Sequence, residues 1–243
     1  MKIQNLKVNA RVAEVGGVAT AIINIYSEVE EEFVDDVVLT DLMADLGASN
    51  DALTTAIEKD KAISKREEFD EARDQAYRAF YAIVKAAVYY PEKTQAESAQ
   101  IVLNVFQKYG DITGKSYEEQ TALTRSLLKE LSSADVAYNS FSVPGFSTLK
   151  SNLQSAQMKY EKTYTDYLEA IEKSKEQDSA SIVKPIVLDA INNKLLVYLR
   201  SAAVFSPDTH RVFAGQVATA VDKANQNVRA RRTVISEFAT GRG

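Results

Sequence analysis

The chain has 243 residues, of which 45% are hydrophobic and 26% charged, and its formal net charge is −5 at pH 7. This balance is typical of a globular protein and argues against disorder throughout, while the mild acidity argues against electrostatic binding to nucleic acid or anionic lipid. There is no cysteine, which excludes disulfides, thiolate metal sites and cysteine nucleophiles.

The N-terminal sequence MKIQNLKVNARVAEVGG lacks the uninterrupted apolar core of a secretory signal. No stretch reaches the roughly 18 consecutive apolar residues that a membrane span needs. The sequence therefore predicts a cytoplasmic protein that makes no membrane contact.

Apolar residues recur at intervals of three and four along most of the chain, the spacing of one helical face. With nine Gly and four Pro, the chain contains few helix breakers. Ser64 with Glu67, and Ser116 with Glu119, have the spacing of a capping box at a helix start. The sequence predicts an all-α fold with eight helices, at residues 11–33, 36–62, 65–90, 94–109, 117–132, 147–177, 181–205 and 207–238.

Two short sequences occur twice, in the same order. AAVYYP at 86–91 returns as AAVFSP at 202–207, and AIEKDK at 56–61 returns as AIEKSK at 170–175. The two offsets differ by only two residues, which fits a short insertion between the second and third helices of the second copy. We infer an internal duplication.

The duplication predicts how the helices are grouped. Residues 1–112 and 115–243 would be two tandem repeats of four helices, each an up-down bundle. The alternative is one interleaved helical body, and the apolar stripes do not decide between the two arrangements.

The repeated hexapeptide predicts a corner between the third and fourth helices of each repeat. Its paired alanines would let a neighbouring helix approach closely, and Tyr89 or Phe205 would fill space at the helix end. Pro91 and Pro207 disfavour the helical conformation in the residue before them, so the helix should stop there. The alternative is a continuous helix with a proline kink.

An acidic run, EVEEEFVDD, is a candidate cation site. Glu28, Glu32 and Asp35 would share one helix face, and hard cations prefer several carboxylate oxygens. Val29 and Phe33 lie between them at the spacing of a buried stripe, which favours solvated acids beside a core-facing helix. We predict no metal site.

Charged residues in the third predicted helix are interpreted as a solvated face. Asp70 and Asp74 alternate with Arg73 and Arg78 at the spacing of helical neighbours. Carboxylates that act in acid–base catalysis need a cleft that shifts their pKa, and a sequence cannot show one. No catalytic residue is therefore assigned here.

The single histidine, His210, could act as a general base. It lies in a predicted first helical turn, where Ser206, Asp208 and Thr209 are better explained as helix-start residues. We expect His210 to be a surface or capping residue whose replacement by alanine leaves stability nearly unchanged. One histidine also excludes the usual di-iron site of four-helix bundles, and no catalytic or cofactor site is predicted.

Tyrosine is the one unusual feature of the composition, with twelve Tyr and no Trp. The plain interpretation is packing at the edge of the core with each hydroxyl in water. The functional alternative is a tyrosine-rich interface or pocket, since tyrosine is favoured at binding surfaces. The candidate partner-binding residues are Tyr77, Tyr81, Tyr89, Tyr90, Tyr160, Tyr164 and Tyr167.

The chain resembles an all-helical bacterial family, a domain of unknown function. The resemblance is carried by the length, by the MKIQNLKVNAR opening and by the two-fold helical layout with its AAVYYP and AAVFSP corners. The resemblance implies an all-helical fold over nearly the whole chain. It brings no site residues with it.

Two functions from different classes fit these observations. The first is a non-enzymatic interaction or scaffold protein, with a protein partner or a second copy of the chain. The alternative is a small-molecule-binding or enzymatic bundle with a pocket between helices or repeats. The lack of a convergent catalytic constellation favours the first, so we expect no enzymatic activity and no cofactor.

Overall fold

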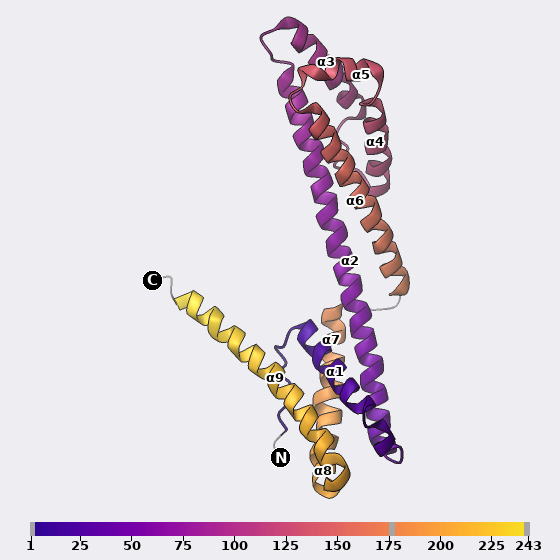
Figure 1. The fold of residues 1–243 in the computed structure, drawn as a ribbon, viewed down its shortest axis with the longest axis vertical. Helices are drawn as coiled ribbons and strands as arrows, with labels where there is room; N and C mark the ends of the chain where they lie inside the picture. Colours follow the sequence, from indigo (N-terminus) through magenta and orange to yellow (C-terminus); the bar gives the residue numbers. More distant parts are fainter. Residues whose placement is uncertain (1–2, 175–177, 241–243) are drawn as a thin grey trace. The chain divides into compact units, whose positions relative to one another are not determined.

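The computed structural model describes residues 3–174 and 178–240, with side chains up to Arg231 (Figure 1). Within these ranges helices account for nearly all the regular structure and no β-strand occurs, which confirms the all-α fold. No helix in the described ranges is long and apolar enough to cross a membrane.

The elements follow one another with short joins. In chain order they are α1 (Val12–Ser27), the 3-10 turn η1 (Glu30–Phe33), α2 (Val37–Ala87), α3 (Lys93–Tyr109), α4 (Tyr117–Glu130), α5 (Ala134–Asn139), the 3-10 turn η2 (Ser140–Ser142), α6 (Phe146–Lys173), α7 (Ala180–Asp189), the π-helical turn η3 (Ala190–Leu195), α8 (Leu196–Phe205) and α9 (Pro207–Thr240). The Ser116 start signal is confirmed, since the Ser116 hydroxyl accepts a hydrogen bond from the Glu119 N–H (3.3 Å).

The chain divides into two compact units, each with its own core. Unit 1 comprises Met1–Asp60 and Ile171–Gly243, and unit 2 comprises Lys61–Ala170. The boundary expected at residues 112–115 lies inside unit 2, so the units are not the two predicted repeats. Instead, each unit combines helices from both halves of the chain: unit 1 takes α1, the first part of α2 and α7 to α9, while unit 2 takes the rest of α2 with α3 to α6.

The continuity of α2 explains this difference. The predicted helix break near residue 63, with Ser64 as a cap, is wrong, because Ser64 and Glu67 both lie exposed inside α2. The stretch ISKREEF contains no Gly or Pro and several strong helix formers, so extending the helix costs little free energy. In the second half of the chain the helix is interrupted, since α6 ends at Lys173 and α7 begins at Ala180.

Both hexapeptides lie where one helix ends and another begins. α2 ends at Ala87 before Pro91, and α9 begins at Pro207, so the structure has corners and not kinked helices. The aromatic residues do not fill space as expected: Tyr89 is 79% exposed and Phe205 84% exposed. Each lies at or beyond the last residue of its helix, outside the stripe in which Ala87 is buried.

Each unit has a core built from the inward stripes of its helices. In unit 1 the core joins α1, the first part of α2, α7, η3, α8 and α9, with side chains such as Ile22, Leu46 and Val221. In unit 2 it centres on Phe80, whose ring meets Phe106 edge-on at 5.0 Å between centroids. The features described next are positioned by these two cores.

Candidate functional site

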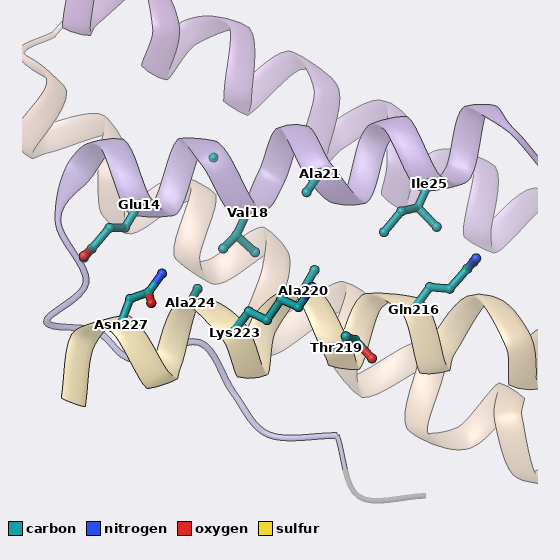
Figure 2. A pocket seen from close by; sticks show the side chains of 11 residues that line it. Glu14, Val18, Ala21, Ile25, Gln216, Thr219, Ala220, Lys223, Ala224 and Asn227 are labelled. Atoms are coloured by element: carbon teal, nitrogen blue, oxygen red, sulfur yellow. The ribbon is translucent and has the colours of Figure 1, made fainter. Parts of the chain in front are cut away.

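A groove of about 610 Å³ runs between α1 and α9 in unit 1 (Figure 2). Small and apolar side chains line much of it, and polar side chains of α9 stand along one side. The lining residues are Glu14, Gly17, Val18, Ala21, Ile25, Gln216, Thr219, Ala220, Lys223, Ala224 and Asn227. A hollow of this composition can accept an apolar surface while the polar side chains satisfy hydrogen bonds around it.

The groove exists because small residues occupy the outer faces of two packed helices. α1 and α9 bury Val15, Ile22, Val217 and Val221 in the core of unit 1. Gly17 lies on the outer face of α1, where a Cβ added to it would meet no atom within 4 Å, so the space beside it is open. The lining positions span twelve residues on each helix, so the groove is about 16 Å long at the helical rise per residue.

One end of the groove carries a satisfied carboxylate. Glu14 accepts a hydrogen bond from the Arg11 N–H (2.6 Å) and pairs with the Arg231 guanidinium. Burial alone would raise the pKa of Glu14, but these two interactions hold it below its ordinary value. Lys223, on the polar side, forms no ion pair within the described residues.

Three of the predicted tyrosines come together in unit 2. The rings of Tyr117, Tyr160, Tyr164 and Tyr167 stack in that order, with centroids 5.9 to 6.0 Å apart. The Arg66 guanidinium lies over the first and last rings, 4.7 and 4.3 Å from their centroids. Tyr117 and Arg66 were not predicted as part of this site, because neither belongs to a tyrosine cluster along the chain.

Beneath this stack Arg73 is wholly buried, at 0% exposure. Its guanidinium donates to Gln120 Oε1 (2.8 Å) and Thr121 Oγ1 (3.0 Å), pairs with Asp70, and lies 3.9 Å from the centre of the Tyr160 ring. The expectation of a solvated face is therefore wrong for Arg73. α4 and α6 supply the partners and the ring that cover it, and these contacts are invisible in the local spacing.

The same network includes Asp74, which accepts from Gln120 Nε2 (2.7 Å) and pairs with the exposed Arg78. Burial raises the pKa of Asp74 above its ordinary value, although the hydrogen bond from Gln120 opposes the shift. The negative charge of Asp70 adds to the increase. The buried Arg73 cation is thus paired with Asp70 and also interacts electrostatically with Asp74, the next residue of α2.

A second groove, of about 430 Å³, lies between α4 and α6 beside the tyrosine stack. Its charged side chains are already paired: Arg125 Nε donates to Glu161 (2.6 Å), and the Tyr164 hydroxyl donates to Glu118 (2.7 Å). Tyr160 also lines it, and its buried hydroxyl has no hydrogen-bond partner among the described residues. An unpaired buried hydroxyl costs free energy, so this group stands out in the site.

The other four candidate tyrosines lie elsewhere in unit 2. Tyr77 stacks on Tyr81 (6.3 Å between centroids) and donates to the Gly110 carbonyl oxygen (2.6 Å); burial raises the pKa of Tyr77 to about 12. Tyr90 packs against the core, and Tyr89 is exposed. The seven candidates therefore do not form one surface.

His210 is buried, at 8% exposure, and the expectation of a surface or capping residue is wrong. Its Nε2 lies 2.7 Å from Asp36 Oδ2, and its Nδ1 lies 2.7 Å from Thr209 Oγ1. Tyr198 donates to the same Asp36 oxygen. The contact joins positions 174 residues apart, so no local pattern could reveal it.

The hydroxyl, imidazole and carboxylate around His210 lie in the order of a hydrolase triad. Thr209 Oγ1, however, is also 3.3 Å from the Ser206 carbonyl oxygen, as expected in a first helical turn. None of Thr209, His210 and Asp36 lines the grooves described above. The arrangement therefore has a structural explanation: it ties the start of α9 to the start of α2.

The acidic run does not form the continuous helix that the sequence suggested, because Glu30–Phe33 is a 3-10 turn with Phe33 buried. Glu28, Glu32 and Asp35 accordingly do not share one face of an α-helix. Across the described part of the chain no three His, Cys, Asp or Glu side chains gather in a way that could hold a metal ion.

Comparison with known proteins identifies a family. No curated protein and no solved structure matches the chain. The model of a family of unknown function (DUF6261) matches residues 63–225, about two thirds of the chain. This match agrees with the resemblance seen in the sequence, and the chain belongs to the DUF6261 family.

Proposed function

We propose that this chain is a non-enzymatic interaction protein, and that unit 1 binds an amphipathic helix of a partner protein in the groove between α1 and α9. The observation that carries the proposal is the composition of this groove, whose apolar and small side chains are bordered by polar ones (Figure 2). Amphipathic helices bind such grooves through apolar side chains at helical spacing.

The dimensions of the groove support a helix as its occupant. Its length of about 16 Å equals three helical turns, which present apolar residues at positions i, i+3 or i+4, and i+7. Ala21, Ala220 and Ala224 leave room for those side chains. Lys223 would meet an acidic residue on the polar face of the partner, since Glu14 is already paired with Arg231.

The test is a selection of binders from a library of amphipathic helical peptides against the full chain. We expect the selected peptides to lose at least tenfold in affinity when Ala220→Arg fills the groove, because a long charged side chain would displace the apolar face. Val212→Arg is the matched control, since Val212 is an exposed residue of α9 outside the groove. Peptides that bind the Ala220→Arg chain as tightly as the native chain would refute the proposal.

A second candidate function is small-molecule binding in the groove between α4 and α6. The unpartnered hydroxyl of Tyr160 favours it, because a side chain retained at a cost in stability often serves binding. The ligand would stack on the half-buried rings of Tyr117 and Tyr164, and a shift of these side chains would let it accept a hydrogen bond from the buried Tyr160 hydroxyl.

For this candidate we expect Tyr160→Phe to raise the free energy of unfolding by roughly 1 kcal/mol, because it removes a buried polar group that has no partner. A ligand found by saturation-transfer NMR should bind the variant more weakly. Urea unfolding measures the first effect. A destabilised Tyr160→Phe chain would show that the hydroxyl is structural and would remove this candidate.

The partner, whether another protein or a second copy, and the cytoplasmic location stay predictions from the sequence. The groove between α1 and α9 favours a protein partner, because its length suits a helix better than a compact ligand.

A further inference from the structure

The described residues that precede α1 form an extended segment that packs on the helices of unit 1. Residues 3–9 precede the first helix, and of their side chains only Ile3 and Leu6 are buried. Most of its other polar contacts are made through its backbone, while the Asn5 and Gln4 side chains accept hydrogen bonds from Arg200 and Arg229. This division of contacts is the starting point of the inference.

Two asparagines hold the backbone of this segment from both sides. Asn192 accepts from the Leu6 N–H (2.8 Å) and donates to the Leu6 carbonyl oxygen (2.9 Å). Asn225 accepts from the Lys7 N–H (2.9 Å) and donates to the Asn5 carbonyl oxygen (2.9 Å). The two asparagines are 7% and 2% exposed, so their amides are fixed in place for an extended strand of backbone.

Two further side chains of unit 1 donate hydrogen bonds to the backbone of the same segment. Arg200 Nε donates to the Ile3 carbonyl oxygen (3.1 Å), and Lys184 Nζ donates to that of Val8 (3.0 Å). Asn192 itself lies in the π-helical turn η3. Turns of this kind are rare in proteins, and those that occur are often found at functional sites. Together these residues form a built receptor for an extended peptide with two apolar side chains three positions apart.

We propose that this receptor also binds in trans, and that its occupant is the N-terminal segment of a second copy of the chain. Residues 3–9 already occupy this receptor within one chain. The same residues of a second copy would make the same four hydrogen bonds with Asn192 and Asn225, so the exchanged and unexchanged forms have the same contacts. The link to α1 is a short turn in which the Ala10 N–H donates to the Lys7 carbonyl oxygen (3.0 Å); Val8 and Asn9 are exposed in it, whereas Ala10 is buried. Exchange of such an element is a low-cost route to dimers. The receptor is separate from the groove between α1 and α9.

A peptide experiment tests whether the receptor accepts the segment in trans. The probe is a dye-labelled peptide with the sequence of residues 1–10, and the protein is the full chain with Ile3→Ser and Leu6→Ser, which weaken the resident segment. Fluorescence anisotropy should show saturable binding, at least tenfold tighter than to the native chain, where the resident competes. Adding Asn225→Leu should weaken binding at least tenfold. A folded double variant that does not bind, or binding indifferent to Asn225→Leu, overturns the proposal.

A second experiment uses the native segment and does not depend on the folding of that variant. The chain has no cysteine, so Val8→Cys, at an exposed position, carries a single nitroxide. This copy, without isotope, is mixed with the ¹⁵N-labelled native chain. We expect broadening of the side-chain amide signals of Asn192 and Asn225 in the labelled copy, and none with a diamagnetic tag. Unbroadened signals at NMR concentrations overturn the exchange between copies.

Discussion

Replacing Arg73 with methionine is expected to lower the free energy of unfolding by about 3 kcal/mol. Arg73 is wholly buried, and its loss leaves the Asp70 carboxylate and the Gln120 carbonyl without their donor. Removing one partner of a buried charged network leaves the other uncompensated, which costs about 3–5 kcal/mol when both are fully buried. Asp70 is partly exposed, so we place the loss at the lower end of that range.

Urea unfolding followed by circular dichroism measures this effect, and Arg78→Met is the matched control. Arg78 lies on the same helix and pairs with Asp74, but its side chain is 61% exposed. Exposed ion pairs contribute about 1 kcal/mol or less, so the control should change stability little. A loss below about 1 kcal/mol for Arg73→Met would show that the network contributes nothing specific to unit 2.

Arg73 also shows how far local spacing can be trusted. On α2 it stands among Asp70, Asp74 and Arg78, and such a run is indistinguishable from an exposed face of paired charges. Gln120 and Gln157, which lie opposite it, come from helices 47 and 84 residues away. Burial of a polar residue depends on such long-range packing. The local spacing of residues in a single sequence therefore does not predict it.

Helix identity was predictable where a strong local signal existed. The proline at 207 and the Ser116 cap mark true helix starts, since both act through the geometry of a single turn. The expected break at Ser64 failed because a capping-box spacing inside a run of good helix formers does not stop a helix. The grouping of helices was inferred from the repeated peptides alone, and the two compact units do not follow the predicted boundary at residues 112–115.

The candidate sites were predictable only in part. Tyrosine clustering along α6 led to the stack of Tyr160, Tyr164 and Tyr167. The groove between α1 and α9 and the asparagine receptor were missed, because small residues and single asparagines have no distinctive spacing. Their meaning appears only when segments about 200 residues apart are brought together.

The second large effect is expected at Asp36, where Asp36→Asn should lower the free energy of unfolding by about 2 kcal/mol at pH 7. This carboxylate accepts from Tyr198, from the Leu39 N–H (3.0 Å) at the start of α2, and lies 2.7 Å from His210 Nε2. Hydrogen bonds to a charged group contribute more than those to a neutral amide. Asp35→Asn, at an exposed neighbouring position, is the control.

The same carboxylate predicts how stability depends on pH. Burial alone would raise the pKa of Asp36, but the hydrogen bonds from Tyr198, Leu39 and His210 lower it below its ordinary value near 3.8. A carboxyl group whose pKa is lower in the folded state stabilises the fold above its unfolded pKa, and this contribution disappears as the pH falls through the folded pKa. The native chain should therefore lose stability below about pH 4, and Asp36→Asn should lose less over the same range.

A double-mutant cycle of Asp36→Asn and His210→Ala measures the interaction free energy between these two side chains. If Asp36 and His210 act together, each single variant is destabilised and the double variant loses less than the sum of the two. Urea unfolding at pH 7 and below pH 4 gives all four free energies. A silent His210→Ala variant, which the sequence alone predicted, would mean that Tyr198 and the cap of α2 hold Asp36 without the histidine.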